Sequence, residues 1–469
     1  MFEKHKDTSL LVHILVCLFG IGAWVGTNGI LIELPILVER LPERWNLASY
    51  LVIAIQLANI GPLLYTVAHL LFPRWVYEKP FAYVIIVLAA LCCLLLIFLW
   101  QQTTEVGGVE HSTILLVLLF FLAMANCTSS VVFLPFMAQL KTSYMTSFYI
   151  GQGLSSLLPS MVALGQGAGA MSCQNRSQGN VTLLGENLTT FYMEAEYYPP
   201  RFPPREFFGF IFVTMVICGL AFVLLNHLSV CKNERVEAKD PIPDEQEKAP
   251  EKLSVVYQAD LKPESVCQDG IPQNDSRGES AGCWSKVKSC FSNCSSESTM
   301  GYFLLLTVNG WINALENGII PSIQSYAYLP YGNQPYHLAL VFANVADPTV
   351  CFLAFFLPTT SKRLVTVFMI LATAASSYII TLASMSPDPF MVEDNLGDIV
   401  AVGAQVIATS FLTYSKLSIA AIFRERGGKS LLWYGAVTQL GSLIGALVTF
   451  YLVNVLNVFV AAPPCRGES

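Results

Sequence analysis

Side-chain amides stand next to glycine at matching places in two long apolar stretches of this sequence. Asn28 precedes Gly29, and Asn317 precedes Gly318. An amide in an apolar medium needs a hydrogen-bond partner, and it can both donate and accept. Glycine lets neighbouring helices approach closely, so amides beside it can meet side chains of the next helix or a solute. This chemistry predicts recognition of a hydrogen-bonding solute, or contact between helices, rather than covalent catalysis.

The candidate substrate contacts are amides, aromatic residues and one acid within the apolar stretches. For any one of them, hydrogen bonding between helices is the simpler interpretation. For the whole set, a polar cavity is favoured, in which aromatic rings can stack on a flat solute. The set consists of Trp24, Asn28, Gln56, Asn59, Asn126, Gln152, Asn313, Glu316, Asn317, Gln324 and Tyr414.

Charged residues within the apolar stretches are few, namely Glu33, Glu316, Asp347 and Lys416. Glu33 is expected near the outer surface in contact with water, and Lys416 can extend its chain to the membrane surface. Three roles stay open for Glu316: a contact to substrate, a site for a coupling proton, or a partner of an unidentified positive group. No series of carboxylates runs through the stretches, so strong ion coupling is not indicated. The lack of a central Arg and Lys cluster argues against an anionic substrate.

Motifs of common catalytic chemistry are missing from the sequence. It has no P-loop, no G-x-S-x-G, no H-E-x-x-H and no Cys-x-x-Cys. The six histidines are scattered without the spacing of metal ligands. We therefore expect neither enzyme activity nor a bound cofactor or metal.

Length and composition indicate the elements that position these residues. The chain has 469 residues, of which 54% are apolar and 13% charged, and its mean hydropathy is +0.54. Three soluble domains, which this length would suggest, need about twice that share of charge. Apolar runs of about 20 residues instead match the length of a membrane-spanning helix. We predict an all-α polytopic protein of the lipid bilayer, and the net charge of −7 argues against a nucleic-acid partner.

Eleven transmembrane helices are predicted. Helices are expected because hydrocarbon offers no partner for free backbone N–H and C=O groups. The spans cover residues 10–31, 48–72, 81–100, 112–138, 146–168, 207–229, 300–322, 336–357, 364–385, 397–423 and 430–460.

Orientation follows from the excess of Lys and Arg in short cytoplasmic loops. That excess favours a cytoplasmic N-terminus, and an odd number of spans then puts the C-terminus outside the cell. The loop 169–206 falls outside, and it contains the sequons at Asn175, Asn180 and Asn187. Glycosylation takes place on the lumenal side, so these three sites support the same orientation independently.

Four segments result from this topology. Residues 1–229 form an N-terminal six-helix bundle with the glycosylated loop 169–206, and residues 300–460 form a C-terminal five-helix bundle. Between them, residues 230–299 are a cytoplasmic loop whose Pro, Glu, Asp, Ser and Lys content predicts disorder. Residues 461–469 are an outside tail. Cys173 and Cys465 are the two cysteines outside, and a disulfide between them is a candidate that the sequence does not decide.

The two halves repeat several motifs at an offset of six spans. An even offset gives both halves the same orientation, so the repeat axis lies along the membrane normal. That is the arrangement of major-facilitator halves, which place a substrate site between them at mid-depth. The matching segments are Trp24 and Trp311, Asn28–Ile30 and Asn317–Ile319, Ala58–Asn59 and Ala343–Asn344, and Gln152–Ser155 and Gln439–Ser442.

Several motifs together resemble the vertebrate riboflavin transporter family. The resemblance covers nearly all spans and leaves out the loops 169–206 and 230–299 and the tail. The segments that carry it are Gly22–Pro35, Leu41–Trp45, Ala58–Gly61, Phe133–Phe136, Gly151–Ser155, Asn317–Gln324, Pro330–Ala339 and Gln439–Ala446.

The resemblance implies uptake of riboflavin at the plasma membrane, eleven spans, and a facilitator-like fold similar to that of equilibrative nucleoside transporters. Riboflavin is neutral at pH 7 and offers a flat ring, an imide edge and a ribityl chain, which suits a pocket of amides and aromatic rings. Two alternatives stay open. One is a transporter of another neutral heterocycle such as a nucleoside, and the other is a membrane receptor that transports nothing.

Overall fold

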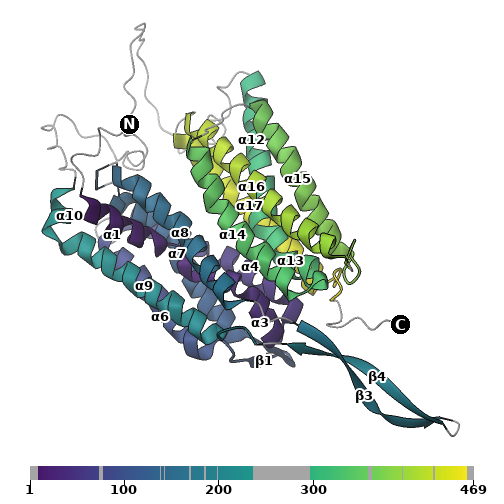
Figure 1. Ribbon diagram of the computed structural model, residues 1–469. Helices are drawn as coiled ribbons and strands as arrows, with labels where there is room; N and C mark the ends of the chain where they lie inside the picture. Colours follow the sequence, from purple (N-terminus) through teal and green to yellow (C-terminus); the bar gives the residue numbers. More distant parts are fainter. Residues whose placement is uncertain are drawn as a thin grey trace, which may run out of the picture.

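The chain forms two helix bundles that lie side by side (Figure 1). The computed structural model describes residues 9–72, 78–137, 139–141, 143–167, 171–183, 186–197, 199–235, 296–356, 362–392, 394–425 and 428–461. The cytoplasmic loop predicted at 230–299 therefore lies outside the described residues except at its two ends, and so does most of the tail predicted at 461–469.

The N-terminal bundle contains six long helical segments, several of them broken. Its helices in chain order are α1 (Leu10–Ile21), α2 (Val25–Ile32), α3 (Leu34–Arg40), the 3-10 turn η2 (Arg44–Asn46), α4 (Leu47–Leu57), α5 (Ile60–Leu71), α6 (Glu78–Leu99), α7 (Thr113–Met137), α8 (Ser143–Gln166), α9 (Pro204–His227) and α10 (Ser229–Asn233).

The C-terminal bundle is built in the same manner from five segments. Its helices are α12 (Ser296–Ala314), the π-helical turn η4 (Leu315–Ile319), α13 (Ile320–Tyr328), the 3-10 turn η5 (Leu329–Tyr331), α14 (Asn333–Phe356), α15 (Lys362–Ser384), α16 (Asn395–Glu425) and α17 (Gly428–Asn454).

Two antiparallel hairpins add β structure that the sequence analysis did not predict. A short one pairs β1 (Thr104–Val106) with β2 (Val109–His111). A long one pairs β3 (Met171–Leu183) with β4 (Glu186–Tyr197) and projects beyond the bundles (Figure 1). The sequons at Asn175 and Asn180 lie on β3 and the one at Asn187 on β4. An extended ladder pairs the backbone N–H and C=O groups of this long connection.

Among the described residues, eight helices are long and apolar enough to cross a membrane, or nine if the bent pair α1–α2 is one span. Two predicted spans do not meet this criterion of length and hydropathy. They are 146–168, which corresponds to α8, and 300–322, which corresponds to α12, η4 and the start of α13. Both carry amides and hydroxyls at regular intervals, which lowers their hydropathy. The fold is thus that of a polytopic helical membrane protein, and the number eleven stays a prediction.

The first and seventh predicted spans are not straight. α1 and α2 meet at a bend of 51°, where Trp24 precedes the first residue of α2. In the second half, the turn η4 interrupts the helix at Leu315–Ile319. A π-helical turn is rare and is frequently found at functional sites. In both halves the break lies beside the Asn-Gly motif.

Contacts between helices repeat at the offset seen in the sequence. α1 packs on α8 and α12 packs on α17, while α4 meets α17 and α14 meets α8 across the two bundles. A Cβ added at Gly151 would lie 2.1 Å from the Cys17 carbonyl oxygen, and one added at Gly441 would lie 2.3 Å from that of Gly310. Equivalent glycines therefore allow the same close helix crossing in both halves.

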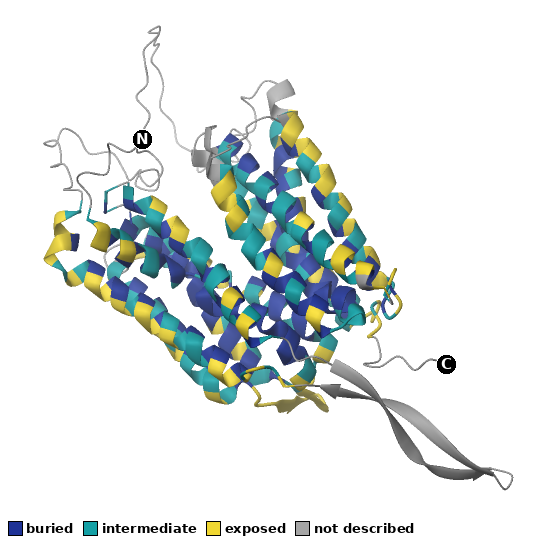
Figure 2. Cartoon of the chain, in the orientation of Figure 1, coloured by how far each residue is buried: buried dark blue, intermediate teal, exposed yellow. Residues whose placement is uncertain are grey.

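The buried side chains concentrate inside each bundle and at the end where the bundles meet (Figure 2). In the N-terminal bundle, Phe19 contacts Phe133, Phe148 and Phe222 with ring centroids 4.3, 5.7 and 4.9 Å apart. These rings join α1, α7, α8 and α9 into one body.

Candidate functional site

Amide groups form a contact between the two bundles. Gln56, which is 8% exposed at the end of α4, donates from Nε2 to the backbone oxygen of Asn317 at 3.2 Å. Asn59 donates to Oε1 of Gln56 at 3.3 Å. The helix breaks between α4 and α5, which brings both amides to the same place. A neutral hydrogen-bonded link of this kind can be exchanged for a neutral polar solute at modest cost.

The same side-chain hydrogen bond occurs once in each half. Asn28 on α2 donates to the hydroxyl of Ser155 on α8 at 3.2 Å. Asn317 in η4 donates to the hydroxyl of Ser442 on α17 at 3.3 Å. Both pairs were matched in the sequence as parts of a repeat, and the structure gives them the same geometry. Both asparagines are half-buried, so their amides can reach a solute between the bundles.

A ladder of asparagines continues from this point into the C-terminal bundle. Asn317 also donates to Oδ1 of Asn313 at 3.2 Å, and Asn313 donates to the backbone oxygen of Asn309 at 2.8 Å. Asn309 in turn donates to the Thr438 hydroxyl at 2.9 Å. Asn313 is fully buried, so its amide positions Asn317 and does not itself reach the interface.

Glu316 has an ion-pair partner inside the C-terminal bundle. Lys416 Nζ lies 2.7 and 2.8 Å from the two carboxylate oxygens of Glu316. The Thr413 hydroxyl donates to Asp347 at 2.6 Å and lies 3.3 Å from Glu316. The positive partner that the sequence left unidentified is thus Lys416. Its ammonium pairs within the protein, so the expected extension to the membrane surface is wrong.

Polar contacts also close the end of the molecule from which the hairpins project. Ser325 donates to the backbone oxygen of Trp45 at 2.6 Å, and the Tyr326 hydroxyl donates to the side chain of Asn46. Asn333 donates to the carboxylate of Glu39. Ser325 and Tyr326 thus join α13 to the turn η2, and Glu39 joins α3 to the first residue of α14. Toward the opposite end the two bundles diverge (Figure 1).

Glu33 is not in contact with water as the sequence analysis expected. It is 1% exposed, and Gln166 donates to its Oε1 at 2.9 Å. Gln166 also donates to the backbone oxygen of Phe202 at 3.1 Å. The bend that starts at Trp24 and the further break before α3 carry Glu33 under the end of α8. A position near the end of an apolar stretch therefore does not imply exposure.

Burial raises the pKa of Glu39 to about 7, and the neighbouring Arg40 opposes this only in part. Glu39 lies beyond the first candidate span. An ionised carboxyl at this position is costly to bury, whereas a protonated one is not. The closing contact with Asn333 therefore includes a group that titrates near neutral pH.

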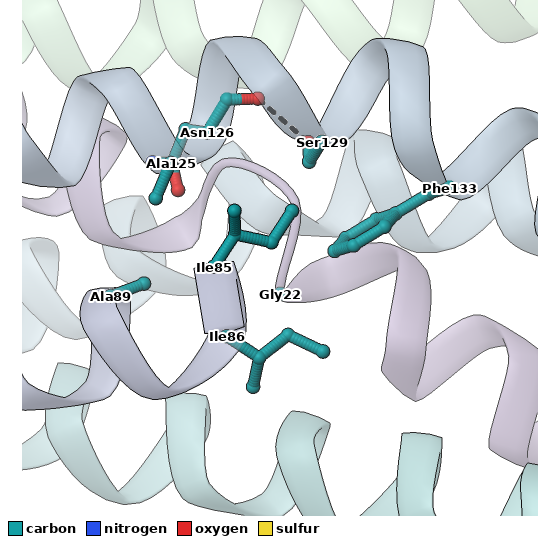
Figure 3. Close-up of a pocket in the computed structure, with 8 residues that line it drawn as sticks. All are labelled: Gly22, Ile85, Ile86, Ala89, Ala125, Asn126, Ser129 and Phe133. Carbon is teal, nitrogen blue, oxygen red and sulfur yellow. Dashed lines mark hydrogen bonds between the residues drawn. The ribbon is translucent and has the colours of Figure 1, made fainter. Parts of the chain in front are cut away.

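Asn126 lines a small cavity among helices of the N-terminal bundle, together with Gly22, Ile85 and Phe133 (Figure 3). Its amide is 2.7 Å from the Thr27 hydroxyl, and with the oxygen accepting that proton its nitrogen donates to the Ala23 carbonyl at 3.2 Å. The adjoining cavity has a volume of about 10 Å³, with Gly22 on its wall. That is room for about one water. Asn126 thus supports the bend between α1 and α2.

The remaining candidates are placed less centrally. Tyr414 packs edge-on against Phe368 of α15 at 5.1 Å between centroids, inside the C-terminal bundle. Gln324 is 4% exposed on α13, toward the closed end. Trp24 is half-buried against the core at the α1–α2 bend, and Gln152 is half-buried one turn before Ser155. The structure thus brings Gln56, Asn59 and Asn317 together at one contact between the bundles. Asn28 lies in a second contact, with Ser155 of α8, the helix that also carries Gln152.

The sequence analysis did not predict the contacts that close the end of the molecule from which the hairpins project. It also did not predict that the carboxyl of Asp347 belongs to a cluster of polar side chains. Glu39 and Asn333 stand in segments of mixed polarity that look like ordinary loops. The only feature of the sequence that could have indicated their pairing is their equivalent position, after the first and the seventh predicted span. The described residues contain no group of three or more His, Cys, Asp or Glu that could bind a metal ion.

The family model of solute carrier family 52, riboflavin transporter, matches residues 8–461. The chain belongs to this family. Solute carrier family 52, riboflavin transporter, member 3-B of Danio rerio is 41% identical over 98% of this chain and 99% of its own length. Member 3 of Homo sapiens is 36% identical over 98% of this chain and 99% of its own length. This is a family of transporters and not of enzymes.

Solved structures with the same fold are also transporters. A mutant of the nucleoside transporter NupG superimposes with a TM-score of 0.53 at 11% identity, over 95% of this chain and 91% of that one. The D-xylose-proton symporter gives 0.52 at 11% identity, over 94% and 89%. At such identity the likeness concerns the fold alone. The predicted facilitator-like architecture, with two helix bundles, is thus confirmed.

Proposed function

We propose that this protein carries riboflavin across the plasma membrane into the cell by alternating access. The observation that carries the proposal is the amide link from Gln56 to the Asn317 backbone. The hydrogen bond from Asn28 to Ser155 in the N-terminal bundle, matched by the one from Asn317 to Ser442, adds to it. The bundles meet at the contact between Gln56 and Asn317, and rocking one bundle on the other exposes it to either side. Family membership supplies the substrate, since the relatives are named riboflavin transporters.

The chemistry of the substrate fits these groups. Each amide of Asn28, Gln56 and Asn317 can donate to and accept from the imide edge of the flavin ring or from ribityl hydroxyls. The hydrogen bonds that these amides make within the protein are 3.2 to 3.3 Å long and neutral. They can be replaced by bonds to riboflavin without leaving an ion unpaired.

The orientation that we propose puts both hairpins and the C-terminus outside the cell and the N-terminus in the cytoplasm. The excess of Lys and Arg in the opposite loops and the three sequons on the long hairpin support it. In this orientation the structure is closed to the outside, through Glu39, Asn333 and the neighbouring contacts. Glycosylation at Asn175, Asn180 and Asn187 is checked by a mobility shift upon treatment with a glycosidase and its loss in the triple Gln variant.

The disulfide between Cys173 and Cys465 stays a prediction. The side chain of Cys173 and all of Cys465 lie outside the described residues. Peptide mapping without reductant decides it, because the linked peptides either appear or do not.

Purified protein in liposomes tests the function. Riboflavin loaded inside should drive uptake of labelled riboflavin from outside, and unlabelled uridine in excess should leave this exchange unchanged. Exchange blocked by uridine would indicate a nucleoside carrier instead. Binding of riboflavin without any exchange would indicate a receptor.

A further inference from the structure

The chain turns back on itself after its last helix. α17 ends at Asn454, and three residues later Asn457 has a φ of 48°. This is the left-handed conformation, which asparagine adopts more readily than most residues. The N–H of Val458 then donates to the carbonyl of Leu452, within the last turn of α17, at 3.1 Å. Residues 455–460, named the strap below, therefore do not continue in the direction of the helix.

The strap is held against the C-terminal bundle at the closed end. Ser386, which follows α15 and is 6% exposed, donates from its hydroxyl to the backbone oxygen of Val460 at 2.5 Å. The centroid of the Phe459 ring lies 5.5 Å from that of the Tyr326 ring on α13. Phe459 is half-buried, whereas its neighbours Val458 and Val460 are 49% and 54% exposed. The strap thus turns one aromatic side chain inward.

Tyr326 is a residue through which α13 meets the other bundle. Its hydroxyl donates to the side chain of Asn46, and its ring lies 5.5 Å from the ring of Trp45 in an edge-on arrangement. Both partners belong to η2 of the N-terminal bundle. Tyr326 is 3% exposed. It therefore has an aromatic neighbour from each bundle, namely Trp45 and Phe459.

The strap begins where the bundles also touch. Asn454 at the end of α17 donates to the Ser49 hydroxyl of α4 at 2.8 Å. One turn earlier, Phe450 meets Tyr50 of α4 edge-on, with ring centroids 5.2 Å apart. One end of the strap therefore starts at the contact of α17 with α4, and the other end lies beside the contact of α13 with η2.

Opening of the closed end has to part Tyr326 from Trp45 and Asn46, because they lie on different bundles. Phe459 stays with Tyr326, since both belong to the C-terminal bundle. Its ring can therefore hold the phenol ring in the position from which the hydroxyl reaches Asn46, before the bundles close. Without Phe459, closure has to immobilise a freer side chain, which costs conformational entropy.

From this juxtaposition we infer that Phe459 is a positioning residue of the closed end. It packs on Tyr326 and so favours the closed form over the open one, and Ser386 fixes the strap that carries it. This role rests on alternating access as in the proposed function, and not on the identity of the substrate.

Spin labels at Glu110 and Gln334, one on each bundle at this end, test the role of Phe459. Attachment through non-natural amino acids leaves the 13 cysteines in place. The distance between the labels is measured in nanodiscs at one fixed pH, with and without riboflavin. In Phe459→Ala the ratio of separated to close labels should rise about threefold or more, since closure then has to order the Tyr326 ring.

Two variants serve as controls. Phe459→Tyr keeps an aromatic ring at this place and should give the ratio of the wild type. Val458→Ala shortens an exposed neighbour in the same strap and should also give that ratio.

Each contrary result removes one claim. A wild-type ratio in folded Phe459→Ala overturns the positioning role and leaves alternating access standing, even if the melting temperature falls. So does an equal rise in Val458→Ala, because the ring would then not be the cause. Labels that keep a single separation in the wild type, with and without riboflavin, contradict alternating access itself, and the positioning role with it.

A second variant covers the case in which Phe459→Ala does not fold. Ser386→Ala removes the hydroxyl that fixes the strap at Val460 and leaves every aromatic ring in place. The ratio of separated to close labels should rise about twofold or more. Ser384→Ala is the matched control, because its hydroxyl donates to the Thr381 carbonyl of its own helix. Equal ratios in the two folded serine variants contradict the role of the strap.

Discussion

At the scale of single residues, the site depends on amides whose partners are other neutral groups. Asn28 with Ser155 and Asn317 with Ser442 make the same hydrogen bond in the two halves. Such a bond contributes about 1 kcal/mol net. A solute with its own donors and acceptors can therefore compete for these amides, whereas it would not readily replace an ion pair such as the half-buried one of Glu316 with Lys416.

The substitutions Asn28→Ala, Gln56→Ala and Asn317→Ala should each weaken the apparent affinity for riboflavin about tenfold, at unchanged surface expression. That corresponds to about 1.4 kcal/mol, or one good hydrogen bond to the substrate. Uptake of labelled riboflavin at several concentrations measures it. Asn226→Ala is the matched control, because this amide caps a backbone oxygen of its own helix α9. Unchanged affinity in all three interface variants would refute the assignment of the pocket.

Asn126→Ala should behave differently from the interface variants. It removes buried hydrogen bonds that hold the α1–α2 bend to α7, at a cost of about 1–3 kcal/mol. We expect a lower melting temperature of the purified protein and fewer copies at the cell surface. The apparent affinity of the copies that remain should equal that of the wild type. A tenfold loss of affinity with normal stability would instead place Asn126 in the substrate pocket.

At the scale of the elements, breaks in the helices position the site. The α1–α2 bend, the α4–α5 break and the π-helical turn η4 each lie beside an amide of the interface. The sequence predicted the location of these features from Asn, Gly and Pro, because these residues change how a helix packs locally. It did not predict the π-helical turn or the pairing of Glu39 with Asn333, since those depend on which segments meet in three dimensions.

The glycine crossings give a test that compares the two halves. Gly151→Ala and Gly441→Ala should each lower the melting temperature by several degrees, because the new methyl group would lie within 2.1 to 2.3 Å of a backbone oxygen on the neighbouring helix. Gly165→Ala and Gly435→Ala are on the same two helices, α8 and α17, and have open space at the added Cβ. These two should not be destabilised. Because Ala favours a helix more than Gly does, an unchanged or higher melting temperature in Gly151→Ala and Gly441→Ala would contradict close packing at these crossings.

The closed end should respond to pH through Glu39. Its pKa is about 7 when buried and lies near 4.5 in water, so the closed form binds the proton more tightly. Closure is therefore favoured fully below pH 4.5, and this contribution is lost as the pH rises to about 7. The distance between spin labels at Glu110 and Gln334, one on each bundle, measures this opening. The share of molecules in which the two labels are far apart should grow as the pH rises from about 5 to 7.5. Glu39→Gln should abolish the change, and a pH response equal to that of the wild type would exclude Glu39 as its source.

At the scale of the whole molecule, the two bundles are stabilised separately. Each has its own core and its own glycine crossing, and the contacts described between them are mostly neutral. The sequence predicted this division from the repeat, because apolar runs and their order along the chain set the topology of a helical membrane protein. The hairpins and the burial of Glu33 were not predictable in this way. Outside the spans, the alternation of polar and apolar residues is a weak indicator of strands, and the position of a residue in the sequence is a weak indicator of its burial.

A reversible cross-link across the closed end tests the central claim of alternating access most directly. Glu39→Cys with Asn333→Cys places two thiols where the bundles contact each other, and a short reducible thiol cross-linker joins them. The account predicts that riboflavin uptake falls to background after linking and recovers after reduction, while the two single variants are unaffected by the reagent. Uptake at the unlinked rate by fully cross-linked protein would contradict it.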